Sequence, residues 1–312
     1  MNNQFAKDIR EGLTANNKHL PSKYFYDAIG SQIFKEIMAM PEYYLTDSEF
    51  EILSTQAPQI VEALKFKTPF NIIELGAGDG MKTFKLLEYL VDKKVNFTYT
   101  PVDISEGAIK DLSTSLKKKL PHLVIEPLIG DYFEVLAKGT APKKPNLLLF
   151  LGGNMGNYLE GDLKQLMQLF YNYLNTNDKL LIGIDLKKNP ITINDAYFDP
   201  HGITKRFNLN LLDRINSEFD ANFNLEHFDF YCHYTPRTGE VRSYIVSLKD
   251  QWIDIDKIDL KVHFKKNELI WTEISKKYSF EDIKALSKNY GFQVDCNFLD
   301  KKAYFVDSLW RK

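Results

Sequence analysis

From about residue 70 the chain alternates short apolar runs with amphipathic stretches, which is typical of a parallel β-sheet covered by helices. The run Leu147–Leu151 lacks polar alternation, so we expect a central strand that is covered on both faces. In chain order, strands are expected at Phe70–Leu75, Phe97–Asp103, Leu123–Ile129, Leu147–Leu151 and Leu180–Leu186. Helices are expected between them at Met81–Leu90, Glu106–Leu116 and Gly161–Leu174.

The same pattern resumes near the C-terminus. Ser279 and Asp282 have the spacing of a capping box and predict a helix that ends at Gly291. The strand-like runs 292–296 and 304–310 follow this helix and predict a late hairpin. The predicted fold class is therefore α/β, with a mainly parallel sheet and one late antiparallel hairpin.

Two segments lie outside this alternation. Residues 189 to about 275 are aromatic-rich and irregular, and we place an insertion on the substrate side of the fold there. Residues 1–56 precede the first strand, and Ser31–Met40 within them carries apolar residues at helical spacing, as expected of a helical cap.

Charge balance narrows the class of partner. The 312 residues include 40 Lys and Arg against 42 Asp and Glu. This even balance gives no reason to expect nucleic acid or an anionic membrane as a partner, so we expect a small-molecule substrate.

The two cysteines, Cys232 and Cys296, are far apart and lack C-x-x-C spacing, so neither a disulfide framework nor a zinc site is expected. A reducing cytoplasm fits this usage best. The first residues contain no apolar core of signal-peptide length, and the longest apolar run is too short to span a bilayer. We therefore expect a soluble protein that is not exported and that binds no metal.

A glycine-rich turn follows the first predicted strand, in the segment Glu74–Gly80. Gly76, Gly78 and Gly80 allow a tight turn and let a ligand approach bare backbone, and the helix that follows offers free N–H groups to an anion. The anion would be a pyrophosphate in a nicotinamide enzyme, or the methionine carboxylate of S-adenosylmethionine in a methyltransferase. The turn alone leaves both possibilities open.

Acidic residues at the next strand ends separate these possibilities. Asp103 is placed to accept hydrogen bonds from two ribose hydroxyls, and Asp131 from an adenine amino group while Tyr132 packs on the ring. The structural alternative for either aspartate is a helix N-cap or a loop residue. Taken together, the glycine turn, Asp103 and Asp131 lie at three consecutive strand ends and favour adenosylmethionine as the cofactor. Lys82 is either a partner of the cofactor carboxylate or a solvated lysine in the first turn of its helix.

Five blocks of the sequence match one known family: the glycine turn, Leu20–Asp27, Met40–Thr46, Leu149–Asn157 and Thr272–Tyr278. They extend over nearly the whole chain. In these blocks the sequence resembles the histidine-specific Nα-methyltransferases of ergothioneine synthesis, which convert L-histidine to its trimethylated betaine, hercynine.

The resemblance implies a Rossmann-like adenosylmethionine-binding domain of residues 57–188 and 276–312. It also implies a smaller α+β substrate-binding domain of residues 1–56 and 189–275, and a monomer. The cofactor would be held by Gly76, Gly78, Lys82, Asp103, Asp131 and Tyr132. A free amino acid would be held by Tyr43, Gly152, Asn157, Tyr197, Glu273 and Ser275, and Tyr43 would also orient the reacting amine.

These residue types suit an amino-acid substrate. Asn157 and the Tyr197 hydroxyl can donate to a carboxylate without burying a second charge. If residues 272–275 are extended, Glu273 and Ser275 share a face, where a carboxylate and a hydroxyl would meet the two imidazole nitrogens. For an isolated Glu-x-Ser, a solvated strand face is the more common explanation.

The chain departs from the family pattern at Gly153 and Asn154, where serine and threonine are usual, and at Ser243, where a methionine is expected in the side-chain pocket. Another aromatic amino acid or related amine therefore remains an alternative acceptor.

Two other enzyme classes compete with this interpretation. In an NAD-dependent oxidoreductase the acidic residue usually follows the first glycine of the turn by about 20 positions, and Asp103 comes later than that. A nucleic-acid methyltransferase should show a basic face, which the even charge balance does not suggest.

Overall fold

The computed structural model describes residues 3–138 and 142–312, which divide into two compact units. The first unit consists of residues 1–44 and 188–275, and the second of residues 45–187 and 276–312. The first two residues of the predicted cap lie outside the described residues. The boundary near the N-terminus falls at Tyr44, earlier than the predicted boundary after residue 56, because the helix that follows is tied to the second unit through Glu49.

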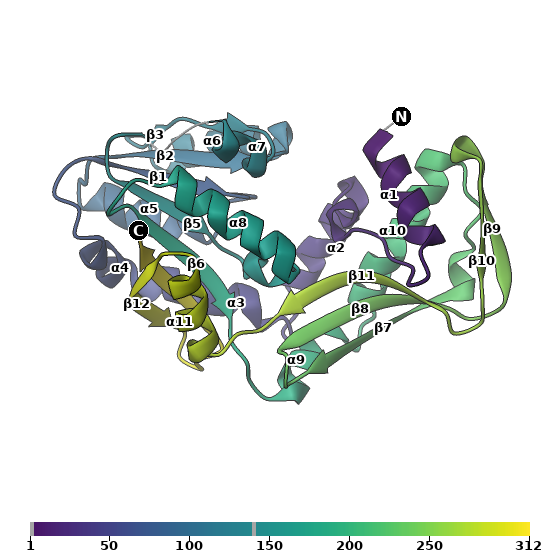
Figure 1. Ribbon diagram of the computed structural model, residues 1–312. Helices are drawn as coiled ribbons and strands as arrows, with labels where there is room; N and C mark the ends of the chain where they lie inside the picture. Colours follow the sequence, from purple (N-terminus) through teal and green to yellow (C-terminus); the bar gives the residue numbers. More distant parts are fainter. Residues whose placement is uncertain (1–2, 139–141) are drawn as a thin grey trace. The chain divides into compact units, whose positions relative to one another are not determined.

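The second unit is built on a mixed β-sheet. Its strands in chain order are β1 (Phe70–Leu75), β2 (Phe97–Asp103), β3 (Val124–Ile125), β4 (Leu128–Ile129), β5 (Asn146–Phe150), β6 (Lys179–Asp185), β12 (Gln293–Leu299) and β13 (Phe305–Arg311). Within the described residues the order across the sheet is β12-β13-β6-β5-β1-β2-β3, and β4 also pairs with β2 (Figure 1). Strand β1 is parallel to β2 and β5, β5 is parallel to β6, and β13 is antiparallel to β6 and β12. The α/β class, with its late antiparallel hairpin, is confirmed.

One predicted strand is broken. The run 123–129 forms the two short strands β3 and β4 rather than one. Pro127 lies between them, and a proline cannot donate to the ladder of hydrogen bonds.

Helices cover the sheet of the second unit. They are α3 (Tyr44–Thr55), α4 (Ala57–Leu64), α5 (Thr83–Asp92), α6 (Glu106–Lys119), α7 (Tyr132–Ala137), α8 (Glu160–Tyr173) and α11 (Phe280–Asn289), with the 3-10 turn η2 (Asn154–Asn157). Helices α7, α8 and α11 share one apolar core with β1, β5, β6 and β13. The capping box at Ser279 and Asp282 is confirmed by both of its hydrogen bonds.

The first unit has its own core and its own sheets. Its elements are α1 (Asn3–Thr14), η1 (Ser22–Phe25), α2 (Ala28–Met38), α9 (Pro190–Tyr197), α10 (Ile203–Phe219), η3 (Leu225–His227), β7 (Phe228–Thr235), β8 (Glu240–Ser247), β9 (Gln251–Ile255), η4 (Asp256–Ile258), β10 (Leu260–Phe264) and β11 (Leu269–Lys276). Strands β11, β8 and β7 form one sheet in that order, β9 and β10 form an antiparallel pair, and α10 packs on α2 and β7 (Figure 1). The expected smaller α+β domain is confirmed.

The prediction of irregular structure between residues 189 and 275 was wrong. The segment contains a 17-residue helix, α10, and the strands β7 to β11. Along β7 the residues alternate between buried and less buried positions, but the more open face carries Tyr231 and His233. Because aromatic side chains stand where polar ones were expected, the period-2 signal of the strand is hidden in the sequence.

Among the described residues, none of the helices is both long and apolar enough to cross a membrane.

A buried ion pair ends strand β6. Lys277 Nζ lies 2.8 Å from Asp185 Oδ2, and the two side chains are 0% and 2% exposed. The backbone reinforces this contact, since Tyr278 N–H donates to the carbonyl of Asp185. Removing one partner of a buried pair leaves an uncompensated charge in a medium of low dielectric.

We therefore predict that Lys277→Met lowers the free energy of unfolding by roughly 3–5 kcal/mol. Lys301→Met is the matched control, because Lys301 is 85% exposed and its pair with Glu51 should contribute little. Equilibrium denaturation in urea measures both variants. Equal losses in the two variants would contradict this account of the pair.

Candidate functional site

The glycine turn after β1 has the geometry that a ligand close to the backbone requires. Gly76 and Gly78 have φ values of 67° and 54°, in the left-handed region that favours glycine. A Cβ atom built on either residue would meet no other atom within 4 Å. The backbone of this turn therefore faces open space, as a bound cofactor would need.

Asp103, at the end of β2, lies beside this turn. Its Oδ2 accepts the Gly78 N–H at 3.1 Å, and its Oδ1 accepts the N–H of Ser105 at 3.0 Å. The structure thus brings together two of the residues predicted from separate strand ends. A carboxylate has about four acceptor positions, so Asp103 retains capacity for further hydroxyl donors.

Exposed apolar side chains flank Asp103, and the motif analysis missed them. Ile104 is 74% exposed, and Met81 and Ile129 are about half exposed. Met81 directly follows the glycine turn, Ile104 directly follows β2, and Ile129 is the last residue of β4, where it pairs with Asp103. An apolar surface at this edge suits the flat ring of an adenine base.

Asp131 and Tyr132 lie at the start of α7. Asp131 is the N-cap of that helix and accepts the Phe133 N–H at 2.7 Å, which is the structural role considered as an alternative for this residue. The Tyr132 hydroxyl is hydrogen-bonded to the hydroxyl of Tyr158, and burial raises the pKa of Tyr132. Tyr158 holds the Tyr132 ring in place and was not anticipated.

Lys82 and Gly152 both contact Glu49, a residue that the sequence analysis did not identify. The Lys82 ammonium forms an ion pair with the Glu49 carboxylate, which also accepts the Gly152 N–H at 2.7 Å. Burial opposes the charge on Lys82, but the Glu49 carboxylate outweighs it and raises the pKa of Lys82. Glu49 is four residues after Leu45 and three before Ile52, so helical periodicity alone marks it as a charge on a buried face.

The loop after β5 also contains the residues that depart from the family pattern. Gly152 and Gly153 have φ values of 84° and 70°, and the Asn154 amide donates to the Leu151 carbonyl at 2.8 Å. Asn154 therefore closes its own loop. Asn157 is exposed at the end of η2.

The remaining predicted residues belong to the first unit. The Tyr197 hydroxyl and the Ser275 Oγ are 2.9 Å apart and buried. The Tyr43 ring lies edge-on to the Tyr197 ring, with centroids 6.2 Å apart. Strand β11 confirms that residues 272–275 are extended, so Glu273 and Ser275 have the spacing at which side chains share a face.

Cys232 and Ser243 lie near these residues. They are directly opposite in the pairing of β7 with β8, and both are buried. The Cys232 thiol contacts the Tyr197 carbonyl at 3.3 Å. Burial raises the pKa of Cys232 to about 12, and the carboxylates of Asp199 and Glu273 add to this effect.

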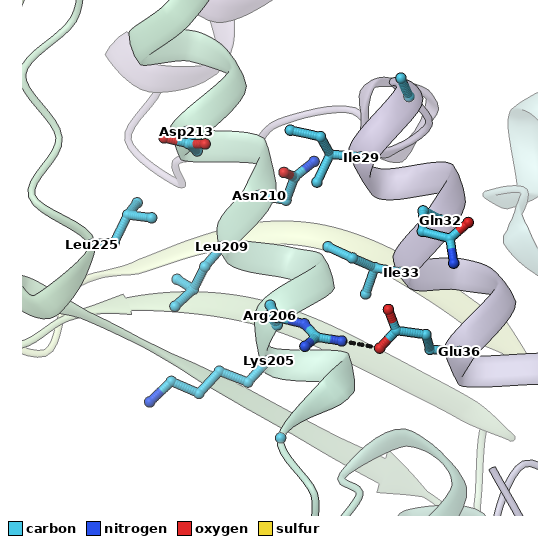
Figure 2. A pocket seen from close by; sticks show the side chains of 12 residues that line it. Ile29, Gln32, Ile33, Glu36, Lys205, Arg206, Leu209, Asn210, Asp213 and Leu225 are labelled. Atoms are coloured by element: carbon cyan, nitrogen blue, oxygen red, sulfur yellow. Dashed lines mark hydrogen bonds and ion pairs between the residues drawn. The ribbon is translucent and has the colours of Figure 1, made fainter. Parts of the chain in front are cut away.

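A separate cavity of about 790 Å³ lies in the first unit, between α2 and α10 (Figure 2). Ile33 and Leu209 form its apolar floor, and an ion pair between Glu36 and Arg206 spans it. Its lining contains none of the predicted site residues, within the part of the chain that the structure describes.

The comparisons with known proteins decide the family. The model of the histidine-specific, SAM-dependent methyltransferases matches residues 5–312. This chain belongs to that family. It is therefore an S-adenosylmethionine-dependent N-methyltransferase, which confirms the predicted cofactor and reaction class and sets the oxidoreductase alternative aside.

Relatives with known names agree with this assignment. This methyltransferase is 32% identical over 279 residues to the histidine N-alpha-methyltransferase of Mycolicibacterium smegmatis, a match that covers 89% of this chain and 86% of the relative. It is 24% identical to an L-tryptophan methyltransferase of Psilocybe serbica, over 95% and 90% of the two chains. Among solved structures, mitomycin 7-O-methyltransferase MmcR aligns with a TM-score of 0.51 and 13% identity, over 99% and 66% of the chains, and so shares the fold.

Glu74, at the start of the glycine motif of this methyltransferase, is a buried acid. Thr83 Oγ1 and the Tyr99 hydroxyl both donate to its carboxylate. Burial raises the pKa of Glu74 to about 7, although the two hydrogen bonds act in the opposite direction. Glu74 therefore binds a proton in the folded state at pH values where the unfolded chain has lost it.

Because of this raised pKa, Glu74 lowers the free energy of unfolding as the pH rises from about 4.5 through about 7. Glu74→Gln resembles the neutral acid in shape and hydrogen bonding, so the variant should not show this loss. Melting temperatures of the two proteins, measured across that pH range, should diverge in favour of the variant as the pH rises. Parallel curves would contradict the raised pKa.

Proposed function

We propose that this methyltransferase transfers three methyl groups to the α-nitrogen of free L-histidine and so produces its trimethylammonium betaine. The supporting observation is the set of polar groups on β11, where Ser275 is hydrogen-bonded to Tyr197 and Glu273 lies two residues away. A neutral imidazole has one donor and one acceptor nitrogen, so a carboxylate and a hydroxyl are complementary to it. The family description and the name of the mycobacterial relative support the same acceptor.

On the cofactor side we assign the predicted residues of the second unit. The open backbone at Gly76 and Gly78 fits the methionine part of adenosylmethionine, and Asp103 fits the ribose hydroxyls. Lys82 is assigned to the methionine carboxylate. Asp131 and Tyr132 are assigned to the adenine, with Asp131 using the acceptor capacity that its N-cap bond leaves.

On the amino-acid side, we assign Asn157 and the Tyr197 hydroxyl to the substrate carboxylate. We also assign Gly152 to the binding of the amino acid. When bound, adenosylmethionine supplies an electrophilic methyl group on a sulfonium. The task of the chain is to hold an unprotonated α-nitrogen with its lone pair on the axis of the breaking bond between sulfur and the methyl carbon. The α-amine of a free amino acid is mostly protonated at neutral pH, so the pocket has to favour proton loss.

We assign Tyr43 to the orientation of this amine. Its ring and the Tyr197 ring also offer aromatic faces to the permanent cation that successive methylations build. Both rings belong to the first unit, as do Glu273 and Ser275.

Tyr43→Phe should slow methyl transfer about 10-fold, the worth of one neutral hydrogen bond in the reacting complex. Single-turnover mass spectrometry follows the mono-, di- and trimethylated products separately. Tyr231→Phe, on an exposed position of β7, is the control and should behave as the parent protein. Three unchanged methylation steps in the Tyr43 variant would refute the assigned role.

Glu273→Gln should raise the KM for histidine by roughly 10-fold to 100-fold, because it removes a charge-assisted hydrogen bond to the imidazole. Cofactor affinity should not change. Glu240→Gln, on β8, is the matched control.

The same assay with a panel of free amino acids separates histidine from the alternative acceptors. Another aromatic amino acid is the second candidate, because Ser243 replaces the expected methionine and one relative is an L-tryptophan methyltransferase. If another amino acid gained mass and histidine did not, the substrate assignment would be overturned and the reaction class retained.

A further inference from the structure

Glu49 is a charged residue in the interior of the second unit. Its side chain is 0% exposed, on the face of α3 that also buries Leu45 and Ile52. An ionised carboxylate in such surroundings is costly unless it is paired and hydrogen-bonded. The partners of Glu49 therefore indicate why a carboxylate stands there.

Those partners come from two different loops at the ligand-facing edge of the sheet. Both carboxylate oxygens of Glu49 accept the Gly152 N–H, at 2.7 and 3.0 Å, and one of them is paired with the Lys82 ammonium. Gly152 follows β5, whereas Lys82 is the N-cap of α5, directly after the glycine turn. One carboxylate thus fixes both loops.

The sheet beneath is shaped to admit this carboxylate. A Cβ atom on Gly183, in β6, would lie only 2.0 Å from Glu49 Oε1. No other residue type fits at position 183 unless Glu49 moves. A glycine inside a strand weakens it, so its presence here indicates a close approach by another group.

Lys82 and Gly152 are themselves neighbours. A Cβ atom on Gly152 would lie 3.6 Å from Lys82 Nζ. An ammonium group has three N–H donors, so Lys82 can bind Glu49 and retain donors for an incoming carboxylate.

Asp307 is a second buried carboxyl group near Glu49 and Lys82. It is fully buried on β13, and within the described residues neither of its carboxyl oxygens has a hydrogen-bond partner. Burial, together with the nearby Glu49 carboxylate, raises the pKa of Asp307 well above its ordinary value, although Lys82 acts in the opposite direction. Glu49 is the carboxylate that is paired directly with Lys82.

We propose that Glu49 is a positioning residue for this enzyme: it holds the Lys82 ammonium where the carboxylate of the cofactor requires it, and it fixes the loop at Gly152 beside that ammonium. The inference rests on the proposed assignment of Lys82 to the cofactor carboxylate. Glu49 does not touch the reacting groups in this account and acts only through its two partners.

The test is calorimetric titration of the full chain with S-adenosylhomocysteine, which retains the carboxylate and allows no turnover. Glu49→Gln keeps the size of the side chain and an acceptor for Gly152 but removes the charge that holds Lys82. We expect its Kd to rise roughly 10-fold to 100-fold, as for the loss of a charged hydrogen bond. Glu49→Asp, which withdraws the carboxylate by one methylene, should weaken binding as well and serves if the glutamine variant does not fold.

Asp178→Asn is the matched control. Asp178 is also a buried carboxylate that accepts a backbone N–H of β5, from Asn146 at 2.9 Å, but at the opposite end of the strand from Gly152. This variant should lose stability and keep the parent Kd. A purely structural role for Glu49 would give the same result in both variants, and that outcome would overturn the proposal.

Lys82→Met separates this inference from the assignment on which it rests. If Lys82 binds the cofactor and Glu49 positions it, Lys82→Met weakens binding, and adding Glu49→Gln to it has little further effect. If Lys82→Met weakens binding and Glu49→Gln does not, the positioning role is refuted and the cofactor assignment stands. If Lys82→Met leaves the Kd unchanged, the assignment of Lys82 itself has failed.

Discussion

The central strands of the second unit are buried along their whole length, and this constraint determines where its chemistry can lie. Strands β1, β5 and β6 present no open face to a ligand. Polar groups of these strands can therefore contact a ligand only where the strands end. Asp103 and the glycine turn meet at such ends. Inside the sheet, the buried Glu74 is paired instead with Thr83 and Tyr99.

The same constraint explains which parts of the fold the sequence predicts well. An apolar run that ends in a glycine turn is recognisable without its neighbours, so β1, β2 and the capping box of α11 appear within a residue or so of their predicted positions. Where local chemistry interrupts the run, as at Pro127, the prediction fails. In the first unit, aromatic residues on the more open face of β7 hide the alternation of apolar and polar residues that would have predicted a strand.

Site residues show a corresponding division. The contact between Asp103 and the glycine turn was predictable, because a short motif carries each of them. The contacts of Glu49 were not, because Gly152 and Lys82 lie far away in the sequence and meet Glu49 only in the fold. Tyr158 is a similar case, since its contact with Tyr132 forms only in the fold. Residues that act through other residues leave little trace in a motif, and a charge at a buried helical position is the clearest signal they offer.

The family fixes the cofactor and the class of reaction, and the first unit supplies Tyr43, Tyr197, Glu273 and Ser275 among the groups that we assign to the acceptor. The most direct measurement follows the transferred methyl itself. Histidine is incubated with the protein and adenosylmethionine labelled with carbon-13 in its methyl group, and the product is examined by NMR. The account predicts that all label enters a single trimethylammonium group on the α-nitrogen. Label on a ring nitrogen, or an unlabelled histidine in the presence of active enzyme, would contradict it.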